Sequence, residues 1–227
     1  MEAFLISICC HLIGDFYLQP ASLAEKKRHS VGFLCLHSLL YTLPFLIAQY
    51  SALQTIQTAM VFDFVYLFGT HILIDAISSR FTTIRAFALD QILHIVVLWI
   101  RITIFEVVSP LSLPYVGIVL AVLFIFQPSK VIVNKTLNAL SMSSDFSATV
   151  HTGYLIGFLE RIVILLLCWY GSVATIGLVF TAKTIVRFPE MKENKTLQEM
   201  YLIGTFLSVV LALLSYGIIL LTKGQLF

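Results

Sequence analysis

Charged residues are scarce in this chain of 227 residues, since Asp, Glu, Lys and Arg make up only 11% of it. Soluble domains carry about 25% charged residues. Hydrophobic residues reach 59%, and the mean hydropathy is +0.97. A globule of this size could not bury so many apolar side chains. The composition therefore excludes a disordered chain, a coiled coil and an ordinary cytosolic enzyme, and it predicts a polytopic membrane protein in a lipid bilayer.

Paired metal-binding cysteines are also lacking, because the four cysteines lie in apolar runs without a ligand-type spacing. We interpret Cys9, Cys10, Cys35 and Cys168 as small hydrophobic residues that face the membrane. The net charge of only +2 excludes an electrostatic surface for nucleic acid. The N-terminus lacks a basic segment, so its apolar run is predicted to be a transmembrane helix rather than a cleaved signal peptide.

The apolar runs predict an all-α, polytopic transmembrane helix bundle of about eight helices. These are Ala3–Gln19, Gly32–Tyr50, Ala59–Ser78, Ala86–Val107, Tyr115–Gln127, Thr152–Tyr170, Val173–Phe188 and Glu199–Leu221. Lys130–Leu140 is predicted to be a short amphipathic segment. A weak division separates residues 1–109 from residues 110–227, because the polar residues of the two parts differ in kind.

Lysine and arginine occupy alternate loops of this predicted bundle. They follow the first, third, fifth and seventh helices, and the opposite loops contain none. The positive-inside rule places the basic loops in the cytoplasm. We therefore predict a multi-pass protein with both termini outside.

Ionisable residues gather in the first four predicted helices. An ionisable side chain inside a bilayer is energetically costly, so its presence indicates a functional role. These residues are His11, Asp15, His37, His71, Asp75, Asp90 and His94. Three His–Asp pairs stand four residues apart, which puts each pair on one helix face. With the orientation above, all seven lie in the cytoplasmic half of the membrane. We expect one polar cavity that faces the cytoplasm.

Imidazole and carboxylate together suit Zn²⁺ best, and also Mn²⁺ or Fe²⁺. We predict that these seven residues bind one or two divalent ions, and paired ions can clamp a phosphoryl group and activate water. The catalytic candidates are Asp15, Asp75 and Asp90, each as ligand, base or ligand-orienting group. Two other interpretations stay open: a proton or ion pathway, and His–Asp hydrogen bonds that only join helices. Asp63 and Glu106 are expected to be solvated.

Other polar residues are candidates for substrate binding: Gln19, Lys26, Gln91, Arg161, Lys183 and Arg187. Lys26 could equally be a simple positive-inside residue. Glu160 and Arg161 are adjacent in a helix and point about 100° apart, so each needs a partner on another helix. One interpretation is ion pairing between helices, for example Glu160 with Lys183. The other is that the basic residues bind an anionic headgroup or phosphate.

The combination of motifs resembles a known family. His11-x-x-x-Asp15, His71-x-x-x-Asp75 and Asp90-Gln91-x-x-His94 are accompanied by Gly157-x-x-Glu160-Arg161 and Lys183-x-x-x-Arg187. This is similar to a domain-of-unknown-function family of bacterial polytopic membrane proteins that are often encoded beside SatD-type proteins. The resemblance implies the bacterial inner membrane and a SatD-type soluble protein as a partner, but it implies no activity. The ligand types are also loosely similar to those of membrane-bound metal-dependent hydrolases.

The leading hypothesis is a metal-dependent hydrolase that acts at the cytoplasmic face on a phosphate-containing substrate, either a small anion or a lipid. A metal-bound water would be the nucleophile. One alternative is a secondary transporter of a divalent cation or a small anion, although the chain has no clear internal repeat. Another alternative is a non-catalytic membrane partner or sensor.

Overall fold

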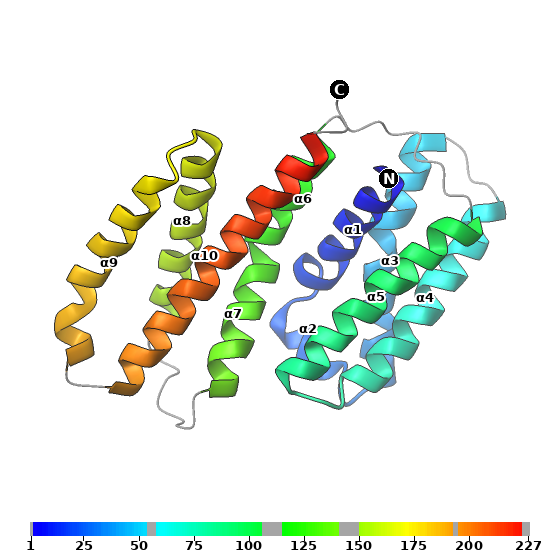
Figure 1. Cartoon of the computed structure of the whole chain (residues 1–227). Helices are drawn as coiled ribbons and strands as arrows, with labels where there is room; N and C mark the ends of the chain where they lie inside the picture. The colour runs from blue at the N-terminus through cyan, green and yellow to red at the C-terminus, as the bar shows by residue number, and fades with distance from the viewer. Residues whose placement is uncertain (1, 54–57, 106–114, 141–149, 193–194, 224–227) are drawn as a thin grey trace. The chain divides into compact units, whose positions relative to one another are not determined.

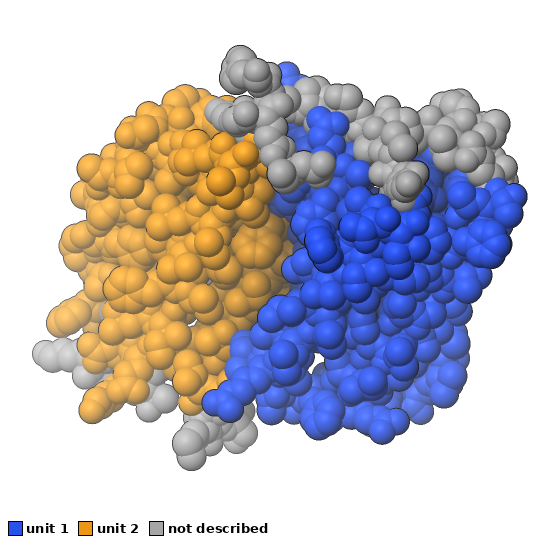
Figure 2. All heavy atoms as spheres, turned by 45° about the vertical axis from the view of Figure 1, so that its right-hand side comes forward, with its two compact units in different colours: residues 1–123 blue, residues 124–227 orange. Residues whose placement is uncertain are grey.

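The computed structural model describes residues 2–53, 58–105, 115–140, 150–192 and 195–223. Within these ranges every regular element is a helix, which confirms the predicted all-α class. The chain divides into two compact units, residues 1–123 and residues 124–227 (Figure 2). The predicted division between residues 109 and 110 falls in the stretch 106–114, outside the described residues.

Unit 1 is built mainly from four long helical segments that pack side by side (Figure 1). Its elements are α1 (Glu2–Leu12), the π-helical turn η1 (Ile13–Tyr17), α2 (Ala21–Lys26), α3 (Val31–Leu53), α4 (Thr58–Ser78), α5 (Ile84–Phe105) and most of α6 (Val116–Ile125). α3 packs against α1, η1 and α4, and α5 packs against α1 and α4. Helices that are distant in the sequence therefore share one interior.

The long helices of unit 1 turn polar residues inward and apolar residues outward. In α3, His37 and Tyr41 are buried, whereas Leu39 and Leu43 are 50% and 45% exposed. In α5, the buried His94 has the exposed Leu93 beside it. A water-soluble helix would show the opposite pattern, so this arrangement fits helices whose outer faces contact lipid.

Along its helices, the interior of unit 1 is apolar in the middle and polar on either side, with Asp63 on one side and the His–Asp residues on the other. The middle layer is an apolar cluster made of Cys10, Tyr41, Phe45, Leu67 and Leu98. The buried residues of α4 include Asp63, Leu67, His71 and Asp75, which follow one another at four-residue steps. The apolar layer therefore separates Asp63 from the His–Asp residues at the other end of the unit.

Unit 2 contains the end of α6, then α7 (Gln127–Leu140), α8 (Val150–Trp169), α9 (Ala174–Lys192) and α10 (Lys195–Lys223). α10 packs against α7, α8 and α9. The core of the unit includes Cys168, and Cys9 and Cys10 are buried in unit 1. These three cysteines thus lie inside the protein, so the prediction that they face the membrane was wrong. Their small side chains fit tight helix contacts.

Among the residues that the structure describes, five helices are long and apolar enough to cross a membrane. They are Val31–Ser51, Thr58–Ser78, Ile84–Phe105, Val116–Leu140 and Gln198–Thr222. The predicted number of eight is higher, and two of the other predicted spans are interrupted or short. The first predicted helix changes from α to π geometry after Leu12, and the apolar part of α9, Ala174–Val186, is short. The predicted fifth helix and the amphipathic segment after it form one stretch, α6 and α7.

Candidate metal centre

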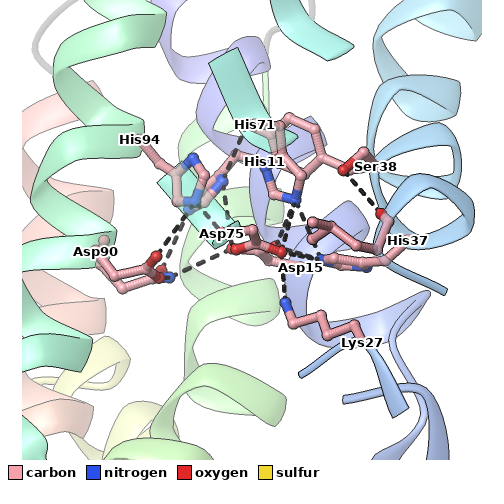
Figure 3. Close-up of polar contacts among 12 residues, drawn as sticks. His11, Asp15, Lys27, His37, Ser38, His71, Asp75, Asp90 and His94 are labelled. Atoms are coloured by element: carbon pink, nitrogen blue, oxygen red, sulfur yellow. Dashed lines mark hydrogen bonds and ion pairs between the residues drawn. The ribbon is translucent and has the colours of Figure 1, made fainter. Parts of the chain in front are cut away.

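A set of His and Asp side chains from separate helices of unit 1 point toward one another (Figure 3). They come from η1, α3, α4 and α5: Asp15, His37, His71, Asp75, Asp90 and His94. The histidines among them are at most 1% exposed in their side chains, and the most exposed carboxylate is Asp90 at 12%. The predicted convergence of these residues from separate helices is confirmed.

Four donor atoms form the tightest part of this cluster. The Nε2 atoms of His37 and His71 lie 3.1 Å apart. Asp15 Oδ1 is 3.3 Å from the first nitrogen and 3.7 Å from the second. Asp75 Oδ2 is 3.4 Å and 3.5 Å from the same two atoms. Each of the two carboxylates therefore presents one oxygen to the same pair of imidazole nitrogens.

A second set of donors adjoins the first. His94 Nε2 lies 3.7 Å from Asp90 Oδ1 and 3.9 Å from Asp75 Oδ1. Asp75 thus faces His37 and His71 with one oxygen and His94 with the other. Three groups of donor atoms, drawn from these six residues, are each close enough to share a metal ion.

The His37 and His71 Nε2 atoms are within hydrogen-bond distance of each other at 3.1 Å, whereas the His–Asp spacings are wider. Hydrogen bonds between nitrogen and oxygen are about 2.7–3.2 Å long. The contacts between histidine nitrogens and carboxylate oxygens in the cluster run from 3.3 Å for His37 and Asp15 to 3.9 Å for His94 and Asp75. Most of these His–Asp contacts are longer than 3.3 Å, the length of the hydrogen bond that Gln91 donates to Asp15. Their spacing is compatible with groups that could hold a shared ion.

His11 and Gln91 lie beside the donor atoms and belong to none of the three donor groups. His11 Nδ1 is 3.3 Å from the hydroxyl of Tyr41, and its Nε2 is 3.3 Å from Gln91 Oε1. The Gln91 amide in turn donates to Asp15 Oδ2 at 3.3 Å and to Asp90 Oδ2 at 3.0 Å. These contacts orient two carboxylates, which is the role of the groups behind metal ligands. His11 belongs to none of the three donor groups, and its ligand role stays a prediction.

Lys27 is the cation that reaches the cluster, and the sequence pattern had favoured Lys26. Its ammonium donates to Asp75 Oδ2 at 2.6 Å. Gln19, with its amide turned to satisfy both neighbours, accepts from Lys27 at 2.8 Å and donates to the Asp15 carbonyl oxygen at 3.0 Å. Lys26 instead lies over the ring of Phe33. Adjacent residues of α2 point in different directions, so only one of the two lysines can face the bundle.

The formal charge of the cluster calls for a cation. Asp15, Asp75 and Asp90 carry three negative charges, and Lys27 supplies one positive charge when the histidines are neutral. Two negative charges are left in a nearly water-free interior. Buried charges are costly unless they are paired or coordinate a metal. One divalent ion would balance this site.

Local backbone features place Asp15 and His71. Asp15 lies in the π-helical turn η1, where Leu18 N–H donates to the Ile13 carbonyl at 2.9 Å. Such turns occur often at functional sites because they redirect one side chain. Gly14 lets this turn approach α3, since a Cβ there would lie 2.9 Å from the Tyr41 Cα atom. The Tyr41 ring stacks on that of His71 at 3.7 Å between centroids, which fixes the imidazole plane.

A family model for a protein of unknown function, DUF3307, matches residues 3–119. The chain belongs to the DUF3307 family. The matched stretch contains the whole His–Asp cluster and Lys27, whereas the polar residues of unit 2 lie beyond it. Among curated proteins and solved structures, none matches the chain.

Unit 2, beyond the DUF3307 match, contains one described ion pair. Lys183 donates to Glu160 at 2.6 Å and to the Thr205 hydroxyl at 3.0 Å. The expected inter-helix ion pair of Glu160 and Lys183 is therefore confirmed. The binding of a substrate anion by Lys183 stays a prediction, and the side chain of Arg187 lies outside the described residues.

Arg161 supports the break between α6 and α7. Pro128 has no backbone N–H, so the preceding turn loses a helical hydrogen bond. Ser129 Oγ donates to the Phe124 carbonyl at 2.8 Å, and Arg161 Nε donates to the Ile125 carbonyl at 3.0 Å. The guanidinium also contacts Ser208 at 3.3 Å. These contacts give Arg161 a structural role, and its predicted role in substrate binding is untested.

Sequence reasoning missed a buried ion pair in the DUF3307 region. Arg101 donates to both oxygens of Asp63 at 2.6 Å and to Ser7 Oγ at 2.9 Å. Asp63 also accepts from Gln49 and is only 2% exposed, so the prediction that it is solvated was wrong. Glu106, the other residue predicted to be solvated, lies outside the described residues. Arg101, unpaired in its own helix, was the signal that Asp63 had a buried partner.

Proposed function

We propose that this DUF3307 protein is a membrane-embedded metal-dependent hydrolase of phosphate-containing substrates. The observation that carries the proposal is the set of four donor atoms from Asp15, His37, His71 and Asp75. A tetrahedron has edges about 1.63 times its centre-to-corner distance, so zinc bonds of about 2.0–2.2 Å give edges of about 3.3–3.6 Å. Five of the six separations among these atoms range from 3.1 Å to 3.7 Å, all those that involve a histidine nitrogen. Zinc is therefore the favoured ion, with manganese and iron as alternatives.

Such an ion would polarise a phosphoryl oxygen and activate a water molecule. In the reaction, the water oxygen bonds to phosphorus while the ester P–O bond breaks, and the leaving oxygen takes up a proton. One ester and one water thus yield an alcohol and a phosphate. Lys27 and Gln19 border the donors and are suited to hold the substrate anion.

The basic residues of unit 1 support an active site at the cytoplasmic face of the bacterial inner membrane. Lys26, Lys27 and Arg28 lie in and after α2. Arg80 lies in the turn between α4 and α5, and Arg85 lies in the first turn of α5. α2 and this turn lie at the same end of the unit (Figure 1). Lysine and arginine beside spans favour the cytoplasmic side. A phospholipid headgroup of the inner leaflet would reach the site from there.

Elemental analysis of the purified full chain in detergent tests the metal site. We expect at least one zinc, manganese or iron ion per chain, and loss of the ion in His71→Ala. His29→Ala is the matched control, because His29 is 77% exposed outside the cluster. Full occupancy in His71→Ala would contradict the proposal. Release of phosphate from a lipid phosphate monoester in mixed micelles, absent in Asp75→Asn, tests the reaction.

A cation transporter is the second candidate, and one observation favours it. The side chains of His37 and His71 are completely buried, as an occluded transport site requires. Uptake of Zn²⁺ or Mn²⁺ into proteoliposomes would support a transporter. Phosphate release without uptake would support the hydrolase.

A further inference from the structure

We propose that the cluster binds a second divalent ion through His94 and Asp90, with Asp75 bridging the two ions. This inference rests on the proposed metal site of His37 and His71. It adds a second metal site beside the first. The charge of the second ion then indicates which class of substrate the site would bind.

The first support is a pair of buried donor atoms that lack hydrogen-bond partners. His94 Nε2 and Asp90 Oδ1 have no hydrogen-bond partner among the described residues, although both atoms are buried. They face each other at 3.7 Å, and the His94 side chain is 1% exposed. The other oxygen of Asp90 is held by the Gln91 amide at 3.0 Å. Each side chain thus offers the other one buried polar atom that makes no hydrogen bond.

The second support is the position of Asp75 between the two sets of donors. Its Oδ2 faces His37 and His71 at 3.4 Å and 3.5 Å, and its Oδ1 faces His94 at 3.9 Å. A carboxylate that gives one oxygen to each of two metals suits the separation of about 3.5–4 Å seen in two-metal sites. Asp15 also belongs to donor groups on both sides, so it can complete the second site.

The two sites require little rearrangement. The contacts of His94 with Asp90 and Asp75, at 3.7 Å and 3.9 Å, exceed the edges expected around zinc. Inward shifts of a few tenths of an ångström would bring the atoms to about 3.3–3.6 Å. Helix-borne side chains make such shifts within one rotamer. The gap is therefore the right size for an ion and too wide for a hydrogen bond.

Charge then indicates the substrate. With neutral histidines, one divalent ion and Lys27 balance the three carboxylates. A second divalent ion leaves two positive charges. A phosphate monoester carries about two negative charges at neutral pH, whereas a diester carries one. The binuclear site therefore matches a phosphate monoester.

The test is the number of Mn²⁺ ions bound by the full chain in detergent, measured by elemental analysis after removal of free metal. We expect about two ions in the wild type and about one in His94→Ala, with His29→Ala unchanged. One ion in the wild type that His94→Ala leaves in place would overturn the second site, while the proposed function stands. No bound ion in the wild type would overturn both.

Three further measurements keep the proposal testable if His94→Ala does not fold. Asp90→Asn keeps the shape of the side chain and should also bind about one ion. Electron paramagnetic resonance of the wild type loaded with Mn²⁺ should show two exchange-coupled ions, and two uncoupled signals would refute the Asp75 bridge. Hydrolysis of a lipid phosphate monoester, followed by release of inorganic phosphate, should be at least tenfold faster than hydrolysis of a lipid phosphate diester, followed by release of the alcohol. Equal rates would overturn the charge match.

Discussion

The contact between Gly14 and Tyr41 permits a test that leaves every metal donor in place. In Gly14→Ala, the new Cβ would lie 2.9 Å from both Cα and Cδ2 of Tyr41 and 3.0 Å from its carbonyl oxygen. Carbon atoms in favourable contact lie about 3.5–4.0 Å apart. The turn that carries Gly14 must therefore retreat from α3 by about 0.5–1 Å, because a clash with backbone is not relieved by a side-chain rotation.

Two effects follow from this displacement. Overpacking of this kind costs about 1–3 kcal/mol, so the free energy of unfolding should fall by that amount. Asp15 is the next residue, and its Oδ1 lies 3.3 Å from His37 Nε2. Metal–ligand distances tolerate only about 0.2 Å. We therefore expect Gly14→Ala to lose most of its bound metal although its donor set is unchanged.

The assay combines thermal unfolding in detergent with elemental analysis. Gly69→Ala is the control, because Gly69 lies in α4 and a Cβ there would meet nothing within 4 Å. Replacing a glycine inside a helix by alanine should stabilise it by about 0.5–1 kcal/mol. A Gly14→Ala variant with wild-type melting temperature and metal content would refute the packing argument for Asp15.

Three other predictions concern the charged groups of unit 1. Arg101→Met should lower the free energy of unfolding by about 3–5 kcal/mol, because Asp63 would be left as an uncompensated buried charge. The folded fraction should keep its metal. A variant with wild-type stability would argue against the ion pair. Lys27→Met should bind Zn²⁺ at least about tenfold more tightly in titrations, because the ammonium no longer competes for Asp75, and Lys26→Met should match the wild type. Metal affinity should fall as the pH is lowered, because histidine and carboxylate bind metals only when deprotonated; a pH-independent affinity measured by titration would count against these ligands.

The sequence alone was enough to predict a membrane protein and the residue types of its candidate site. Its apolar runs are too extensive for a water-soluble globule, and periodicity within one helix is enough to put His71 and Asp75 on the same face. Positive-inside counting then placed the polar residues at a common depth. Each of these inferences uses only neighbours along the chain, and for that reason each was accessible without coordinates.

Tertiary structure decided which side chains meet across helices. The sequence offered no means of choosing Lys27 over Lys26, because the choice depends on how α2 turns against the bundle. The pairing of Asp63 with Arg101 joins α4 to α5, and no periodicity within either helix encodes that contact. The two oxygens of Asp75 face different histidines only because three helices converge there. Distances between helices arise from packing, and packing is a property of the whole fold.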